Sequence, residues 1–310
     1  MIFHIKQSIC TLPDVELNTF GKALNTALDK HHFIEYDYSV EKWLHDVMLT
    51  NNYFSKIDLE VLLEDCNMWD KPDGISSANL TLFYVGNGEN DTISPKDMLK
   101  IVQERSVVVV ENADNDWCAI KRWVKLYSKD RTIKSIAEKV HRAITSDLIR
   151  PDSNGGGNGT ILNCIDRNIQ YFLALSKYKI TSIFDSDKNS INDSTEHNKV
   201  LREGLIARGI EYHELLKREI ENYFPLTTYE RAKLVTDSVP LASLNMHEWD
   251  YLDVYESPLY KKCFNIEKKD VPKLCMELTK DELSERLSSN PPQNDYNEVQ
   301  RIILLLAKYI

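Results

Sequence analysis

The predicted elements of this chain are arranged around the stretch of residues 179–189, KITSIFDSDKN. It begins as a short apolar and β-branched run, which is typical of a buried strand, and the run stops at two carboxylates one residue apart, Asp185 and Asp187. Proteins of the α/β class place acidic groups in this way at the carboxyl edge of a parallel sheet, where ligands bind. Because residues i and i+2 of a strand point to the same side, both carboxylates can converge on one hard cation. The alternative is a polar turn in which an aspartate caps the next helix.

The same order of strand, polar loop and helix repeats on both sides of this stretch. Val107–Val110 is a pure β-branched run, the mark of a strand buried on both faces, and Tyr212–Leu216 is a further strand candidate. The order βαβαβαβ over residues 106–225 requires a mostly parallel sheet with right-handed crossovers, flanked by helices. The other elements predicted in this region are a strand within 144–150 and helices over 117–128, 160–175 and 196–208, the last ended by Gly209.

The rest of the chain is expected to form an accessory domain and a helical elaboration. Residues 1–100 show mixed helix and strand patterns without a cluster of catalytic groups, so we predict an N-terminal α/β accessory domain. Residues 101–310 are expected to form a second domain that carries any catalytic groups, whose C-terminal part is mainly helical and ends in a helix over 297–310 with an apolar stripe that must be buried. The elements predicted within 1–100 are helices at 12–30, 40–49, 59–66 and 95–103, the last capped by Ser94, and a strand at 79–85.

Composition narrows the class of protein. The net charge of −10 argues against a generic nucleic-acid coat protein, yet residues 117–150 carry nine Lys and Arg against three acids. Such a run is either a solvated helix face or a track for a phosphate backbone. The six cysteines are scattered without a CxxC pair, so neither a zinc site nor a disulfide framework is expected. No apolar run approaches the roughly 20 residues that span a bilayer, and the N-terminus lacks a signal-peptide pattern. We therefore expect a cytoplasmic protein without membrane contact.

Acidic residues follow three of the predicted strands. Glu111 comes after the first, the pair Asp185 and Asp187 after the central one, and Glu221 after the last. Because the carboxyl ends of parallel strands meet at one edge of the sheet, these side chains can lie close together. Four carboxylates in one site repel each other unless divalent cations neutralise them. Two cations roughly 4 Å apart support in-line attack on a phosphodiester.

Four motifs carry a resemblance to a known family. They are VVVVEN at 107–112, IFDSDK at 183–188, LKREIENYF at 216–224 and KKDVPKLCMEL at 268–278. In this order they resemble the first glutamate, the DxD pair, the later acidic motif and the lysine segment of the TOPRIM (topoisomerase–primase) domain. The chain is most similar to the nuclease branch in overcoming-lysogenization-defect (OLD) family proteins and related phage-defence effectors. The resemblance spans residues from about 100 to about 280 and implies a TOPRIM-like fold.

The resemblance implies roles for five carboxylates. Glu111 would be a metal ligand or general base, and Asp185 and Asp187 would be metal ligands. Glu221 would hold a second metal, helped by Glu219. The ions would be Mg²⁺ or Mn²⁺, two in number.

Two further roles are implied with alternatives. The second acid of the first loop would be Asp114 or Asp116, and we choose Asp116, although neither stands at the usual spacing of four. The residue after the first glutamate is Asn112, where glycine is common in the family. Lys269 would be the lysine that stabilises the transition state, and Lys268 fits as well.

These motifs predict a metal-dependent nuclease that cleaves DNA or RNA by a two-metal mechanism. No GxxxxGK[ST] is present, whereas OLD proteins fuse the nuclease to an ATPase, so we expect a separate ATPase partner and a role in antiphage defence. Homo-oligomerisation stays open. One alternative is a haloacid-dehalogenase-like phosphatase with Asp185 as the nucleophile, because IFDSDK also fits the start of that family. The other is a non-catalytic TOPRIM docking module.

Overall fold

The computed structural model describes residues 1–30, 32–48, 80–89, 91–153, 158–257, 260–290, 292–293 and 295–310. The chain divides into two compact units, one of residues 1–106 with 307–310 and one of residues 107–306. The division falls in strand β4 (Ser106–Val109), whereas the predicted boundary at residue 100 lies inside helix α4 (Pro95–Gln103). The final residues of the chain belong to the first unit, which the sequence pattern did not indicate.

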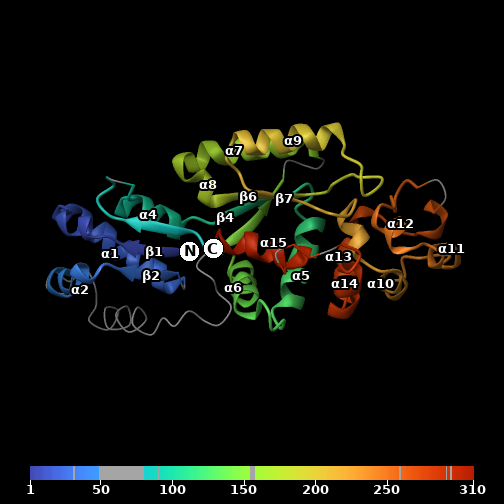
Figure 1. The fold of residues 1–310 in the computed structure, drawn as a ribbon, viewed down its shortest axis with the longest axis horizontal. Helices are drawn as coiled ribbons and strands as arrows, with labels where there is room; N and C mark the ends of the chain where they lie inside the picture. The colour runs from blue at the N-terminus through green and yellow to red at the C-terminus, as the bar shows by residue number, and fades with distance from the viewer. Residues whose placement is uncertain are drawn as a thin grey trace. The chain divides into compact units, whose positions relative to one another are not determined.

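The first unit contains a three-stranded parallel sheet in the order β2-β1-β3 (Figure 1). Helices α1 and α4 pack against each other beside it, and Ser94 caps α4 by accepting a hydrogen bond from the Asp97 backbone N–H at 3.2 Å, as predicted. The helix predicted at 59–66 lies outside the described residues. The other elements are β1 (Ile2–Ile5), the 3₁₀ turn η1 (Gln7–Thr11), α1 (Asp14–Asp29), β2 (Phe33–Tyr36), α2 (Tyr38–Trp43), the π-helical turn η2 (Leu44–Met48) and β3 (Leu82–Val85).

The second unit is built on a four-stranded sheet in the order β5-β4-β6-β7, in which β4 pairs with β6 and β6 with β7 in parallel. This agrees with the predicted mostly parallel sheet flanked by helices. The strand predicted within 144–150 begins later, because helix α6 continues to Thr145 and Asp147 turns the chain with a φ of 57°. The strands are β5 (Ile149–Asp152), β6 (Ile180–Phe184) and β7 (Tyr212–Glu214).

Helices cover both faces of this sheet. Figure 1 shows α7 and α9 along one face and α5, α6 and α15 along the other. The core between the sheet and the α7–α9 layer includes Val107, Ile165, Phe184 and Leu205, each at most 1% exposed. The helices are α5 (Asn115–Tyr127), α6 (Lys134–Thr145), α7 (Ile161–Phe172), α8 (Ser176–Lys179) and α9 (Glu196–Ala207), with the 3₁₀ turns η4 (Asn158–Thr160) and η5 (Leu173–Leu175).

The C-terminal part of the second unit is helical, as predicted. The apolar stripe of the last helix is buried in the core, since Val299, Ile302, Ile303 and Leu306 are at most 1% exposed. Its elements are η6 (Ile220–Tyr223), α10 (Leu226–Arg231), α11 (Val239–Ala242), α12 (Met246–Asp250), η7 (Lys261–Cys263), η8 (Lys268–Asp270), α13 (Val271–Glu277), α14 (Lys280–Leu287) and α15 (Glu298–Ala307).

Candidate metal centre

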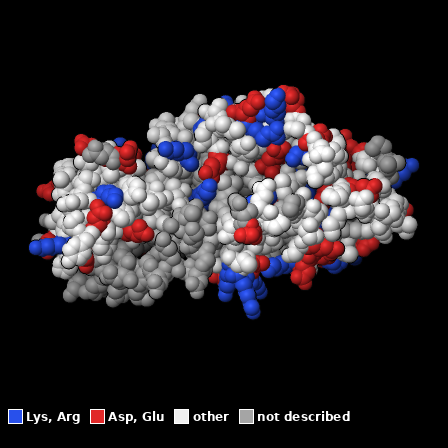
Figure 2. All heavy atoms as spheres, in the orientation of Figure 1, with Lys and Arg blue, Asp and Glu red and all other residues white. Residues whose placement is uncertain are grey.

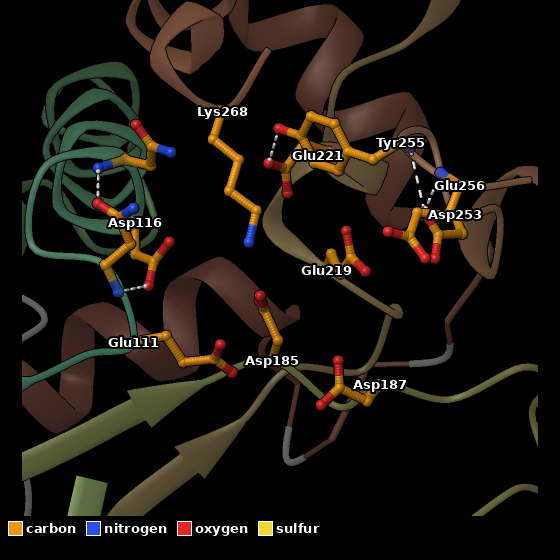
Figure 3. A pocket seen from close by; sticks show the side chains of 12 residues that line it. Glu111, Asp116, Asp185, Asp187, Glu219, Glu221, Asp253, Tyr255, Glu256 and Lys268 are labelled. Atoms are coloured by element: carbon orange, nitrogen blue, oxygen red, sulfur yellow. Dashed lines mark hydrogen bonds between the residues drawn. The ribbon is translucent and has the colours of Figure 1, made fainter. Parts of the chain in front are cut away.

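A cavity of about 180 Å³ lies in the second unit beyond the carboxyl ends of β4, β6 and β7. All six carboxylates that the sequence singled out line it, and Figure 3 shows them around one space. They come from three loops that are far apart in sequence but follow neighbouring strands. The acidic lining consists of Glu111, Asp116, Asp185, Asp187, Glu219, Glu221, Asp253 and Glu256, and the remainder of Asn112, Asn115, Tyr255 and Lys268.

The loop after β4 fixes the first two acids. The Asn112 backbone N–H donates to Asp116 Oδ2 at 2.8 Å, and Asn112 Oδ1 accepts from the backbone N–H groups of Asp114 and Asn115 at 3.0 and 3.1 Å. These bonds satisfy amide groups at the start of α5 and place the buried Asp116 side chain in the cavity. Asp114 is exposed and does not line the cavity. Asp116, rather than Asp114, is therefore the second acid of this loop that lines the cavity beside Glu111.

The loop after β6 carries the DxD pair. The backbone N–H groups of Ser186 and Asp187 both donate to the Arg218 carbonyl at 3.0 Å, which ties this loop to the segment after β7. Asp185 Oδ1 accepts from the Ile220 backbone N–H at 3.1 Å. Asp187 has a φ of 53°, a left-handed conformation that aspartate adopts more readily than most residues. In Figure 3 both carboxylates point toward the space between the three loops.

The segment after β7 carries Glu219 as the N-cap residue of the 3₁₀ turn η6 and Glu221 within that turn. Asn222 anchors this turn, because its side-chain amide donates to the carbonyls of Trp249 and Leu252 at 2.7 and 2.8 Å while its Oδ1 accepts from the Glu219 N–H at 2.8 Å. The Tyr255 hydroxyl donates to Glu221 Oε1. The asparagine of the Glu-Asn-Tyr motif thus has a structural role in orienting the acids.

Burial and mutual repulsion raise the pKa values of these acids. Burial is the largest cause, and neighbouring carboxylates add to it, so that the pKa of Glu111 rises to about 8, that of Asp116 to about 7 and that of Glu219 to about 8. The pKa of Asp185 is also raised well above its usual range, and the pKa of Glu221 is raised by burial. Glu111 Oε1 is buried without a hydrogen-bond partner. This edge of the sheet therefore holds more carboxylates than its surroundings neutralise.

Lys268 is the lysine among the residues that line the cavity. Its charge lowers the pKa values of Glu111, Asp116 and Glu221, although burial outweighs it at each. The choice of Lys269 from the sequence is corrected in position: its side chain is 75% exposed, and its Nζ pairs with Glu267 at 2.6 Å outside the cavity. Both lysines belong to one 3₁₀ turn, in which adjacent side chains point in different directions. The sequence alone therefore could not show which of the two lysines faces the cavity.

Three cavity residues, Asp253, Tyr255 and Glu256, were not expected from the sequence. They lie after α12 in the helical part, where no strand pattern precedes an acidic loop. Asp253 Oδ1 accepts from the backbone N–H groups of Tyr255 and Glu256 at 3.1 and 2.8 Å, and its Oδ2 accepts from Arg218 Nη2 at 3.1 Å. The long-range contacts with Arg218 and Glu221 reveal that this turn belongs to the site.

The residues of the cavity fit a hard divalent cation. Carboxylate and amide oxygens are the ligands that Mg²⁺ and Mn²⁺ prefer. The buried Glu111 Oε1 accepts no hydrogen bond, and a bound cation would supply the partner that it lacks. Among the described residues, no group of three or more His, Cys, Asp or Glu side chains is arranged closely enough to hold a metal ion as it stands. The carboxylates would therefore have to move closer together to coordinate a cation, and the cation would offset the repulsion that opposes this movement.

Comparisons of the chain with protein-family models, curated proteins and solved structures found no match. Within the described part of the chain, none of the helices has the length and apolarity needed to traverse a bilayer.

Proposed function

We propose that this protein is a metal-dependent nuclease that cleaves phosphodiester bonds in DNA or RNA. The observation that carries the proposal is the gathering of six carboxylates from three loops, together with one lysine, in a single cavity at the sheet edge, where burial raises the pKa values of Glu111, Asp185 and Glu219. The resemblance to TOPRIM nucleases, seen in the sequence motifs, agrees with this arrangement.

The residues that would hold one or two Mg²⁺ or Mn²⁺ ions are Glu111, Asp185, Asp187 and Glu221, with Asp116 and Glu219 beside them. Bound ions of this kind lower the pKa of an attacking water and stabilise the charge on the leaving oxygen. Glu111, whose Oε1 has no other partner, offers an acceptor for a proton from that water. The Lys268 ammonium would donate hydrogen bonds to the phosphoryl oxygens as negative charge builds up on them.

Basic side chains offer a surface for the nucleic-acid backbone. Figure 2 shows Lys and Arg gathered on the surface in the region of helices α5 and α6. Lys121 and Lys125, four residues apart on α5, are exposed, as are Lys129 and Arg131 in the following turn. Lysines free to approach phosphates supply the sequence-independent part of nucleic-acid affinity. This supports the phosphate-track interpretation of the basic run.

The proposal extends to a biological role. The chain has no GxxxxGK[ST] motif, while the OLD proteins that its motifs resemble contain an ATPase, so the nuclease would work with a separate ATPase and would serve in defence against phage. An ATPase that co-purifies with the protein and stimulates cleavage would support this part.

The test is incubation of the protein with plasmid DNA and with total RNA, with and without Mn²⁺. We expect cleavage that requires the metal and disappears in Asp187→Ala but persists in Asp114→Ala, which changes an exposed acid of the loop after β4 that does not line the cavity. Metal-dependent release of phosphate from small phosphomonoesters, with a phospho-aspartate trapped at Asp185, would instead favour the phosphatase. Absence of both activities, with unchanged binding to an ATPase partner in Asp187→Ala, would favour the docking module.

A further inference from the structure

A second cavity, of about 770 Å³, adjoins the metal centre. It lies between the loop after β6 and the segment around α12. Its lining includes the half-buried rings of Tyr251 and Tyr260 and the aliphatic side chains of Leu244 and Leu252. Its volume falls within the roughly 300–1,000 Å³ of small-molecule sites, which are mostly apolar with a few polar groups.

Asp253 and Arg218 join the two cavities. Asp253 lines both of them. Arg218 spans the boundary, since its Nε donates to Glu219 Oε1 at 3.2 Å on the metal side and its Nη1 donates to Asn189 Oδ1 at 2.7 Å on the other. A molecule bound in the second cavity would therefore lie next to any cation or phosphodiester bound at the carboxylates.

The acids that line the second cavity already have partners. Glu248 Oε2 accepts from the Asn245 backbone N–H at 2.8 Å in the cap of α12, and Asp253 accepts from Arg218 and from two backbone N–H groups. The groups that remain for a ligand are the aromatic and aliphatic surfaces and polar side chains such as Ser257 and His247. An occupant that suits this lining is a flat, uncharged ring with polar edges.

We propose that the second cavity binds one unpaired nucleobase of the nucleic-acid substrate, adjacent to the phosphodiester at the metal centre. This rests on the proposed nuclease function and narrows its substrate class. A base can enter only when it is not stacked in a duplex, so the substrate is single-stranded nucleic acid or a strand with a nucleotide turned outward. Tyr251 and Tyr260 supply the faces on which the base packs, and the neutral polar groups reach its edges.

The test is a binding measurement that needs no cleavage. Single-stranded DNA of about 12 nucleotides, carrying the fluorescent base 2-aminopurine at one position, is titrated with the protein in EDTA, and the base is moved along the strand. We expect quenching at one position and binding weaker by about 5-fold to about 150-fold in Tyr251→Ala, the loss typical of one stacking platform. Tyr251→Phe keeps the ring and should bind as wild type. Tyr171→Ala removes an exposed tyrosine that lines neither cavity and should also bind as wild type.

A second variant covers the case in which Tyr251→Ala unfolds. Leu244→Trp narrows the cavity without removing a packing group and should abolish position-specific quenching. Quenching without any cleavage in Mn²⁺ would refute the nuclease and retain the base site. Three results, each obtained together with cleavage, would refute the base site alone. They are the absence of a quenched position, quenching that is unchanged in Tyr251→Ala or Leu244→Trp, and binding of the complementary duplex as tight as that of the single strand.

Discussion

The acidic residues at the edges of the two mostly parallel sheets have different surroundings, and their pKa values shift in opposite directions. In the first unit, Asp37 follows β2 and accepts from His4 Nε2 at 2.8 Å and from the Gln7 backbone N–H at 3.2 Å, with Lys6 nearby. The hydrogen bond from His4 is the largest cause that lowers the pKa of Asp37. In the second unit, the acids after β4, β6 and β7 line one cavity, and the pKa values of Glu111, Asp185 and Glu219 rise. A carboxylate at a sheet edge is thus not a site by itself. The two edges differ because burial and neighbouring carboxylates raise the pKa values of Glu111, Asp185 and Glu219, whereas hydrogen bonds and a nearby lysine lower that of Asp37.

The largest expected difference between the two edges is in activity. Asp185→Asn keeps the size of the side chain but removes a charge that cations require, so we expect nuclease activity to fall by about 1,000-fold or more, which corresponds to about 4 kcal/mol in the barrier. Asp37→Asn should change nuclease activity less than about 2-fold, because Asp37 does not line the cavity that would hold the cations. Initial rates of plasmid or RNA cleavage at saturating Mn²⁺ measure both. Equal losses in the two variants would remove the distinction between the edges.

The two adjacent lysines provide a smaller, matched difference. Lys268→Ala removes a cation that faces the acids, and we expect kcat to fall by about 100-fold, as for the loss of one transition-state donor. Lys269→Ala removes an exposed lysine paired with Glu267 and should leave kcat unchanged. Single-turnover rates separate this effect from substrate binding. Activity lost in Lys269→Ala but kept in Lys268→Ala would reverse the correction made from the structure.

Stability without metal should respond with opposite signs. In EDTA near pH 8, Asp185→Asn removes repulsion and should raise Tm by about 2–8 °C, equivalent to about 1–2 kcal/mol for a unit of this size. Asp37→Asn should lower Tm, because it removes a carboxylate that hydrogen bonds stabilise. Differential scanning calorimetry of both variants gives the two signs. A lower Tm in Asp185→Asn would mean that the acids are not repelling one another.

The pH dependence follows from the same pKa shifts. Folded Glu111 and Glu219 keep their protons up to a pH of about 8, whereas unfolded glutamates lose them near 4.5, so the folded state binds more protons between these values. Without metal, unfolding free energy contributed by these groups therefore falls as pH rises from about 4.5 to about 8. Mn²⁺ binds the deprotonated acids, so the rise in Tm that it causes should be larger at pH 8 than at pH 6. An equal rise at both pH values would contradict protonation of the empty site.

The smallest expected effect concerns the basic surface. Lys125→Ala combined with Lys129→Ala removes two exposed charges, so the slope of log affinity for single-stranded nucleic acid against log salt should become shallower by about 1.4. Lys199→Ala, on α9, should leave the slope unchanged. Fluorescence anisotropy titrations at several salt concentrations provide the slopes. An unchanged slope in the double variant would favour a solvated helix face over a phosphate track.

Much of the sheet and its acids could be predicted because both leave local signals. A β-branched run followed by carboxylates identifies a buried strand and its edge, and parallel pairing brings Glu111, Asp185 and Glu221 to one cavity. Asp116 was preferred over Asp114 without a spacing argument, and only the bond from the Asn112 N–H shows why it faces inward. The family resemblance added roles to these positions that no local pattern contains.

The remaining features depend on contacts distant in sequence. The turn of Asp253 and Tyr255 follows a helix and has no strand before it, so its place at the site depends on the bonds to Arg218 and Glu221. The return of residues 307–310 to the first unit could not be predicted, because it leaves no mark in the helical pattern of 297–310. The periodicity of apolar residues predicts single helices and strands. Contacts between elements that are distant in sequence depend instead on how the core packs.

The most direct test of the central claim is a crystal structure of the full chain soaked in Mn²⁺, measured at the manganese absorption edge. The account predicts anomalous peaks in the cavity within about 2.5 Å of carboxylate oxygens from Glu111, Asp185, Asp187 or Glu221, and no peak beside Asp37. A cavity without a peak at saturating Mn²⁺, with its carboxylates still apart, would contradict it.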